Sequence, residues 1–328
     1  MKWPGRRETG ATTGGRKDAA PGPGQAAVDR PSGDGLPRVA AITMSRDSGP
    51  VLRRWVEHYQ RQLGADDVFV VDDHSVDGST DDLPCTVLRL PYLDKYSFEP
   101  SRMGILSGLA KSLLFAYDAV LLADADEFVV ADPAVHDSLR HFAAARRGTD
   151  VAGVLGYNVI HRIGVEPELD FDAPSLLRQR EFARFTPLMC KPALKWVDAD
   201  WGHASHGIRH PFAPDPELFM FHFKFADVGQ LELLAEHRHQ AAVVEGRAVK
   251  SSWSRPTDEI VEALRTAAAQ VEQAVAADEL GRFRPGPKKL EAIVQNEGDL
   301  WRATGAGQHL ALVKPPYVRI PDRLRDLV

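Results

Sequence analysis

Three apolar runs of strand length in the first half of the chain end directly in polar residues, most of them acidic. "RVAAITM" (38–44) precedes "SRDSGP", "DVFVV" (67–71) precedes two aspartates, and "AVLLA" (119–123) precedes "DADE". Helical segments separate the runs, and the clearest begins at Pro50 and stops at Gly64. Strands that alternate with helices and are apolar on both faces predict an α/β fold with a mixed, mostly parallel sheet flanked by helices.

The chain divides into three sections by composition. Residues 1–37 are rich in Gly and Pro and lack an apolar run, which predicts a disordered tail. Residues 38–250 carry the strand and helix pattern, with one strand expected over 119–130 and an N-cap expected at Asp227. Residues 251–328 are expected to form a mainly helical C-terminal extension, which would cover the acceptor side or mediate homo-oligomer formation.

Charge and cysteine content exclude several classes of protein. The net charge is -6, so the chain has no global basic field to hold nucleic acid or an anionic membrane surface. No stretch approaches the roughly 20 apolar residues that a membrane span needs. Cys85 and Cys190 lie far apart without metal-binding or redox spacing. We expect a cytoplasmic protein with no transmembrane segment that binds no nucleic acid.

Candidate binding residues gather after the expected strands. In open α/β sheets, ligands bind in the crevice outside the carboxyl ends of the strands. The candidates at these positions are Ser45, Arg46, Asp47, Asp72, Asp73, Asp124, Asp126 and Glu127. One Asp or Ser at such a point commonly caps a helix or closes a turn. Three groups of them at three strand ends favour a ligand site instead.

The "DAD" sequence at 124–126 is the most specific of these groups. In an extended chain, residues two apart point to the same side, so Asp124 and Asp126 could approach one cation. Carboxylate oxygens suit Mg²⁺ or Mn²⁺, which proteins often share with the phosphates of a substrate. Two carboxylates at the end of a buried strand would otherwise repel each other. The sequence therefore predicts a divalent cation at this position.

Three other classes of site do not match the sequence. The first strand is followed by "SRDSGP" and not by G-x-G-x-x-G, which disfavours a Rossmann dehydrogenase. No Walker loop for a nucleoside triphosphate occurs either. Phosphatases of the haloacid-dehalogenase type normally have Thr or Val two positions after their aspartate pair, where this chain has Phe128.

The ordered set of motifs over residues 38 to 130 resembles a known family. "ITMSRDSGPVLRRWVEHYQRQLGADDVFVVDDHSVDGS", "SRMGILSGLAKS" and "VLLADADEFVV" look like the nucleotide-sugar-dependent glycosyltransferases of the GT-A fold, in the family-2-like group. The similarity weakens beyond residue 130. The resemblance implies a nucleotide diphosphate sugar as donor and a Mn²⁺ or Mg²⁺ cofactor.

The resemblance also implies roles for individual residues. Asp72 and Asp73 would face the base and ribose of the donor, with Asp73 as the base-contacting carboxylate, and Ser45 to Asp47 would lie along the nucleoside. Arg102 matches a basic position near the diphosphate. Asp124 and Asp126 match the DxD motif, in which Asp126 would bind the metal and Asp124 the ribose or the metal. His222, between aromatic residues, matches a histidine that completes the metal shell, although a histidine satisfied by a backbone carbonyl is equally compatible.

The catalytic base stays unassigned at this stage. An inverting transferase needs a group that deprotonates the acceptor hydroxyl, and the weak candidates are Asp200, Glu127 and His206. The Q-x-x-R-W signature of processive polysaccharide synthases is missing from this part of the chain. We therefore expect a non-processive, metal-dependent transfer of a sugar to a hydroxyl group of a glycan, a lipid-linked acceptor or a small molecule.

Two alternatives remain open from sequence. A sugar nucleotidyltransferase shares the sheet and the cation, but usually has a Gly-rich basic loop after the first strand, and "SRDSGP" is short and acidic. A catalytically degenerate protein that binds a nucleotide, or an interaction module on the same fold, is the second alternative. The missing assignment of a base keeps it open.

Overall fold

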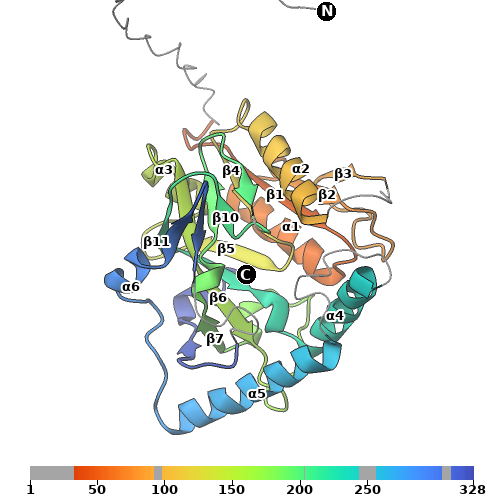
Figure 1. Cartoon of the computed structure of the whole chain (residues 1–328), viewed down its shortest axis with the longest axis vertical. Helices are drawn as coiled ribbons and strands as arrows, with labels where there is room; N and C mark the ends of the chain where they lie inside the picture. Colours follow the sequence, from red (N-terminus) through yellow and green to blue (C-terminus); the bar gives the residue numbers. More distant parts are fainter. Residues whose placement is uncertain (1–32, 92–97, 203, 244–255, 305–311) are drawn as a thin grey trace, which may run out of the picture.

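The computed structural model describes residues 33–91, 98–202, 204–243, 256–304 and 312–328 (Figure 1). Within them, ten strands form one sheet in the order β14-β7-β6-β8-β4-β1-β2-β3, with β11 paired to the other edge of β6 and β5 paired to β11. These strands are β1 (Val39–Ser45), β2 (Val68–Asp72), β3 (Thr86–Arg89), β4 (Ala119–Leu122), β5 (Glu127–Ala131), β6 (Val151–Ile160), β7 (Phe182–Phe185), β8 (Pro192–Lys195), β11 (Ala213–His222) and β14 (Val318–Arg319).

The sheet is mixed and mostly parallel, as the sequence predicts. The strand pairings give β1, β2, β3, β4, β6, β11 and β14 one direction, while β5, β7 and β8 run the opposite way. The helices are α1 (Pro50–Leu63), α2 (Phe98–Leu113), α3 (Leu139–Ala145), α4 (Val228–Val243), α5 (Thr257–Ala276) and α6 (Pro287–Glu291). The α/β class with flanking helices is therefore confirmed.

Helices cover both faces of the parallel part of the sheet. Alternate residues of β1 point to opposite sides, so Val39 and Ala41 join the core under α1, whereas Ala40 and Ile42 join the core under α2. The α1 helix begins at Pro50, whose fixed φ suits a first helical position, and Gly64 follows its last residue at φ 140°. This two-sided burial explains why the strand is apolar throughout.

The C-terminal section contains the expected long helix and also short strands. In Figure 1 α5 runs along the end of the molecule opposite α2, and its apolar residues pack against Phe182, Leu231 and Tyr317 of the same chain. Strands β12 (Val294–Glu297) and β13 (Leu300–Ala303) form a second sheet with β9 (Trp201–Gly202) and β10 (Gly207–Ile208), and β14 joins the main sheet. The expected boundary near residue 250 lies outside the described residues, as does most of the expected N-terminal tail.

Ion pairs to one buried carboxylate and a helix cap attach the later elements to the sheet. The carboxylate of Asp132 forms ion pairs with the guanidinium groups of Arg284 and Arg323. Asp227 caps α4, because its Oδ1 accepts a hydrogen bond from the backbone N–H of Gln230 at 2.8 Å, which confirms that prediction. No helix in the described part of the chain combines the length and apolar character that crossing a bilayer requires.

The prediction of one strand over residues 119–130 is wrong. Strand β4 ends at Leu122 and β5 starts at Glu127 in the opposite direction. The intervening turn is closed by a hydrogen bond from the N–H of Glu127 to the carbonyl of Asp124 at 2.9 Å. The polar side chains of Asp124 and Asp126 end the buried strand, and the two residues therefore do not lie on one side of an extended chain.

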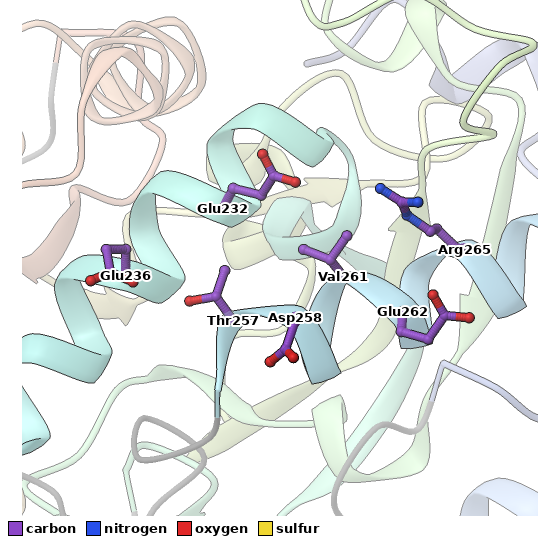
Figure 2. Close-up of a pocket in the computed structure, with 7 residues that line it drawn as sticks. All are labelled: Glu232, Glu236, Thr257, Asp258, Val261, Glu262 and Arg265. Carbon is purple, nitrogen blue, oxygen red and sulfur yellow. The ribbon is translucent and has the colours of Figure 1, made fainter.

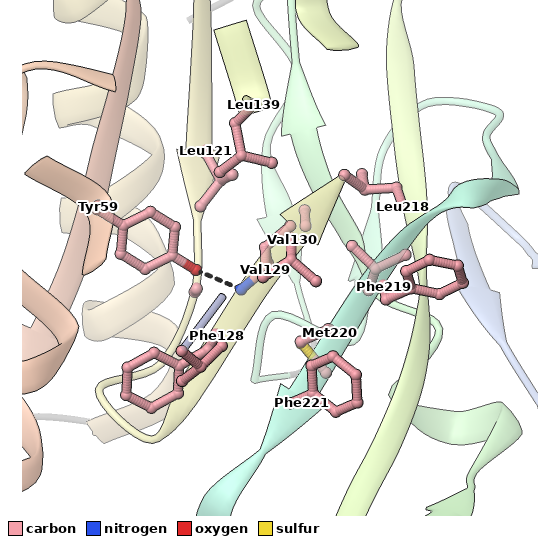
Figure 3. Close-up of a cluster of buried hydrophobic side chains, with 14 of the residues drawn as sticks. Tyr59, Leu121, Phe128, Val129, Val130, Leu139, Leu218, Phe219, Met220 and Phe221 are labelled. Carbon is pink, nitrogen blue, oxygen red and sulfur yellow. Dashed lines mark hydrogen bonds between the residues drawn. The ribbon is translucent and has the colours of Figure 1, made fainter. Parts of the chain in front are cut away.

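Helix α1 holds the strand that follows this turn (Figure 3). The hydroxyl of Tyr59 donates to the carbonyl of Glu127 at 3.1 Å and accepts from the N–H of Val129 at 3.0 Å. His58 Nε2 lies 2.8 Å from the carbonyl of Val129 and Nδ1 lies 3.2 Å from the carbonyl of Leu327, and burial lowers the pKa of His58 to about 4. Two side chains of α1 thus complete the hydrogen bonding of β5 on the edge away from β11.

Candidate functional site

The carboxyl ends of β1, β2 and β4 meet at one edge of the sheet. Ser45 pairs in register with Asp72, and the N–H of Asp73 donates to the carbonyl of Ser45 at 2.9 Å. Ser45, Asp72 and Asp73 are all buried. The sequence prediction that these residues come together at the end of the strands therefore agrees with the geometry.

Two of the predicted donor-binding carboxylates hold loops in place. Asp47 Oδ1 accepts hydrogen bonds from the N–H groups of Val76 at 2.7 Å and Asp77 at 3.1 Å. Asp47 itself has a left-handed backbone at φ 48°, a conformation that Asp tolerates better than most residues. Its carboxylate connects the loop after β1 to the loop after β2. Arg46 lies beside it, with Nε 3.6 Å from Asp47 Oδ2.

Asp72 has a similar supporting role. Its Oδ1 accepts from the N–H of Ser75 at 2.8 Å, and its Oδ2 accepts from the hydroxyl of Thr80 at 3.0 Å and from Arg89 at 2.9 Å. These contacts occupy both oxygens, so the carboxylate is committed to the loop over residues 74–80. The role in donor contact expected for Asp73 stays a prediction.

Asp124 lies between two cations. Arg102 contacts its Oδ1, and Lys191 Nζ is 3.0 Å from its Oδ2. Burial alone would raise the pKa of Asp124, but the charges of Arg102 and Lys191 outweigh it and lower that pKa. Burial likewise opposes the charge of Lys191, while Asp124 and Glu127 raise its pKa to about 12. Arg102, expected near the diphosphate, contacts Asp124, and each oxygen of Asp124 is paired with one cation in the structure.

Glu127 is the buried partner of the same lysine. Lys191 Nζ is 2.5 Å from Glu127 Oε1, and Glu127 Oε2 accepts from the N–H of Asp124 at 3.0 Å. The side chain of Glu127 is only 1% exposed. Burial raises its pKa, although Lys191 opposes this. Both oxygens of Glu127 are engaged inside the protein, where they hold the turn in shape.

Asp126 and His222 face each other across the edge of the sheet. Strand β5, which follows the turn, pairs with β11, and the N–H of Phe223 donates to the carbonyl of Asp126 at 2.8 Å. His222 Nε2 lies 3.5 Å from Asp126 Oδ2, and Arg238 Nη2 of α4 lies 3.7 Å from the same oxygen. Although burial opposes ionisation, His222 and Arg238 lower the pKa of Asp126, which keeps it charged.

The donor set of Asp126 and His222 fits a divalent cation. Asp126 Oδ2 is buried and has no hydrogen-bond partner among the described residues. An ionised, unsatisfied oxygen beside an imidazole nitrogen is the mixed ligand type that Mn²⁺ accepts, and substrate phosphates commonly complete such a shell. No group of three or more His, Cys, Asp or Glu side chains able to hold a metal occurs in the described ranges. Among the described residues, Asp126 and His222 are the pair that would contact such a cation.

The remaining base candidates differ in their position. Asp200 follows β8, whose last residue Lys195 pairs with Val120 at the start of β4, and its side chain is exposed. Asp200 therefore lies near the start of β4, whereas Asp124 follows the opposite end of that strand. Lys191 Nζ, by contrast, contacts the hydroxyl of Ser205 at 3.0 Å, which places the loop before β10 at the site.

His206 belongs to this loop. Its Nδ1 lies 2.9 Å from the carbonyl of Leu188, and burial together with the charge of Lys191 lowers its pKa to about 3. The neutral ring donates from Nδ1, so Nε2 carries no proton. Ala204 and Ser205 before it both have left-handed backbones, at φ 55° and 66°. Such consecutive non-glycine residues cost of order 1–3 kcal/mol each and are found where a functional loop is constrained.

The sequence did not reveal Lys191 or Arg238. Lys191 sits in "CKPALKW", before a strand whose antiparallel place beside β4 is decided by tertiary contacts. Arg238 lies in a helix with little periodic pattern. Buried carboxylates need cationic partners, so the acidic residues at 124–127 were the signal in the sequence that a lysine or an arginine lies beside them.

A separate hollow of about 610 Å³ lies between α4 and α5 (Figure 2). Its lining is rich in carboxylates and consists of Glu232, Glu236, Thr257, Asp258, Val261, Glu262 and Arg265. Glu236 and Arg238 are two residues apart and so point about 200° apart around α4. The hollow is therefore on a different face of the helix from the contact with Asp126.

Comparison with known proteins gives little. No protein-family profile matches the chain, and no curated protein sequence is similar to it. A mannosyltransferase from Pyrobaculum calidifontis, solved with GDP-Man and Mn²⁺, is 13% identical over 76% of this chain and 77% of its own, with a TM-score of 0.31. A mannose-1-phosphate geranyltransferase from Thermus thermophilus is 12% identical over 71% of this chain and 64% of its own, with a TM-score of 0.26.

A cytidylyltransferase from Leptospira borgpetersenii serovar Hardjo-bovis is 13% identical over 36% of this chain, with a TM-score of 0.24. The aligned part spans about half, 53%, of that protein. All three similar structures are transferases by name. At TM-scores of this size the similarities carry no argument about function, and membership of the family-2-like group stays a prediction.

Proposed function

We propose that this chain transfers a sugar from a nucleoside diphosphate sugar to a hydroxyl group, with Mg²⁺ or Mn²⁺ as cofactor. The observation that carries the proposal is the pairing of Asp126 Oδ2 with His222 Nε2 at 3.5 Å, at the strand edge that also holds Asp73 and Ser45. A carboxylate and an imidazole would hold the cation, and the neighbouring strand ends would hold the nucleoside.

The site divides its tasks among the charged residues. Asp126 and His222 would be the metal ligands, and a bound cation would neutralise the charge that develops on the leaving nucleoside diphosphate. Asp124 is held by Arg102 and Lys191 and keeps the turn in shape. Its side chain is partly exposed, and there it would accept a hydrogen bond from a ribose hydroxyl. Arg238, whose side chain is 29% exposed beside Asp126, is placed to contact a phosphate.

The first test is calorimetric titration of UDP, GDP and TDP into the full chain with and without Mn²⁺. One nucleotide should bind in a metal-dependent way, and Asp126→Asn should lose that dependence because it removes the ionised ligand. Asp198→Asn is the matched control, since Asp198 is an exposed carboxylate paired with Lys111 at the far end of α2. Metal-independent binding, or equal loss in both variants, would contradict the proposal.

A second candidate function is nucleotide binding without turnover. The observation that favours it is the state of the base candidates: Glu127 is engaged by Lys191, Asp200 is remote, and His206 has a pKa of about 3. A group of such low pKa accepts a proton weakly at neutral pH. Slow hydrolysis of a donor sugar nucleotide that requires Mn²⁺ would support the transferase; tight nucleotide binding with no hydrolysis and no transfer would support the second candidate.

A further inference from the structure

Strands β6 and β7 bring one buried polar residue each to the side of His222, which ends β11. Asn158 of β6 pairs in register with His222 of β11 on one edge and with Arg184 of β7 on the other. Thr186 follows β7 directly, and both Asn158 and Thr186 are buried. Gly156 makes this approach possible, because a Cβ there would overlap the backbone of Met189 in the short helix η2 (Pro187–Met189).

The hydroxyl of Thr186 has one hydrogen, and the neighbouring groups indicate where that hydrogen points. It donates to the carbonyl of Arg184 at 3.2 Å, an oxygen that can only accept. It lies 3.4 Å from Arg184 Nη1, which can only donate. The remaining partner is Asn158 Nδ2 at 3.0 Å. With the hydroxyl hydrogen on the carbonyl of Arg184, the amide of Asn158 donates to Thr186, and the amide has this orientation in the structure.

The orientation of Asn158 in turn assigns the histidine. With Nδ2 turned to Thr186, the amide oxygen Oδ1 faces His222 Nδ1 at 2.7 Å. An amide oxygen accepts only, so Nδ1 must carry a hydrogen and donate it. The other ring nitrogen, Nε2, is the one that faces Asp126. Which nitrogen of a histidine is open to a metal is set by the hydrogen bond that the other nitrogen makes.

We propose that Asn158 and Thr186 are positioning residues that keep the proton of His222 on Nδ1 and thereby present Nε2 as a metal ligand beside Asp126. This inference rests on the proposed metal-dependent function. The relay runs from the Arg184 carbonyl through the Thr186 hydroxyl and the Asn158 amide to the ring, in the arrangement that the structure shows. Neither residue would touch the cation or the donor sugar.

The tautomer of His222 can be measured without any metal. Long-range ¹⁵N–¹H spectra of the full chain, recorded well above the ordinary pKa of histidine, distinguish a protonated from an unprotonated ring nitrogen, and His222→Asn assigns the signals. We expect wild type to carry its proton on Nδ1. Asn158→Leu and Thr186→Val should shift the ring toward protonation at Nε2, and Thr186→Ser, which keeps the hydroxyl, should restore the wild-type pattern.

Thr43→Val is the matched control for Thr186→Val. Thr43 is buried in β1 and its hydroxyl has no hydrogen-bond partner among the described residues, so removing it breaks no contact that the relay needs. If wild type carries the proton on Nε2, the inference is overturned, and this result needs no variant to fold. It is also overturned if Thr186→Val and Thr43→Val leave the same tautomer as wild type.

The second readout is Mn²⁺ affinity, followed by the electron paramagnetic resonance of the free ion. Loss of a hydrogen-bond partner behind a metal-ligating histidine typically lowers affinity about 10- to 100-fold, and we expect this for Asn158→Leu and Thr186→Val but not for Thr43→Val. If the tautomers behave as expected and wild type binds no Mn²⁺, the proposed metal dependence fails and the assignment of the relay stands. If Mn²⁺ binds equally to all variants, the positioning role fails and the proposed function stands.

Discussion

The ammonium group of Lys191 lies 2.5 Å from Glu127 Oε1, and this contact places a fixed positive charge directly behind the acidic turn. The same nitrogen contacts Asp124 and Ser205, so one side chain joins β8, the turn and the loop before β10. The lysine is 3% exposed and the glutamate 1%. Two ions at this depth are tolerated only as partners.

Replacing Lys191 by Met should therefore destabilise the chain strongly. The change leaves the charge of Glu127 buried without its partner, which costs about 3–5 kcal/mol in comparable sites. Urea denaturation measures the free energy of unfolding. Lys111→Met is the control, because the pair of Lys111 with Asp198 is exposed and its loss should leave the free energy of unfolding nearly unchanged. Equal losses in the two variants would contradict the buried role of Lys191.

Replacing Tyr59 by Phe should cost stability by a different route. The phenylalanine fills the same space but leaves the N–H of Val129 and the carbonyl of Glu127 without the hydroxyl, and a buried unsatisfied group costs about 1–3 kcal/mol. Tyr157→Phe is a useful comparison, because its hydroxyl serves only the carbonyl of Phe283 in the described contacts. Urea curves should show the larger loss for Tyr59→Phe; the reverse order would speak against the role of Tyr59 in holding β5.

Stability should fall as the pH is lowered from about 6.5 to about 4. Burial lowers the pKa of His58 from 6.5 to about 4, so the unfolded chain binds a proton in this window and the folded chain does not. The contribution is complete above the unfolded pKa and is lost on the way down, by up to about 3 kcal/mol. Denaturation series at several pH values should show a shallower decline for His58→Gln. Parallel curves for the two proteins would exclude His58 as the cause.

Adding a methyl group at Gly156, which is not itself a site residue, should shift the residues beside His222. Gly156→Ala would force η2 away from β6, because the new Cβ overlaps the backbone of Met189, and Thr186 would move with it. We expect a lower melting temperature and weaker Mn²⁺ binding. Gly108→Ala is the control: Gly108 is exposed in α2 with open space around its Cβ, so alanine should stabilise that helix by up to about 1 kcal/mol. A melting temperature that rises in both variants would show that the close approach is unimportant.

The sequence predicted those features that depend on local pattern. The period of α1, its proline start and the apolar run of β1 are visible within single segments, and the strand edge at Ser45 and Asp73 follows from them. It could not predict the break between Leu122 and Glu127, because an alanine between two aspartates suits a strand and a turn alike. The pairing partners of the carboxylates were also hidden, since Lys191 and Arg238 reach the turn from segments far along the chain.

The prediction of Asp124 as a metal ligand illustrates the limit. Spacing alone makes Asp124 and Asp126 equivalent, and only the position of Arg102 and Lys191 separates them. Likewise, Glu127 has the chemistry of a general base, but its depth and its lysine partner remove it from that role. Residue type indicates what a side chain can do, whereas its neighbours decide which of these tasks remains open.

Helix α1 begins where the loop after β1 ends. In its second half it carries the adjacent residues His58 and Tyr59, which contact the backbone of β5. Gly49, the residue before the helix, is tied to the loop after β2, because its N–H donates to Asp77 at 3.0 Å. The spacing between the loops after β1 and β2 and the acidic turn is thus set by the length of one helix. Lengthening or shortening α1 by a single residue would shift these two parts of the candidate site relative to each other.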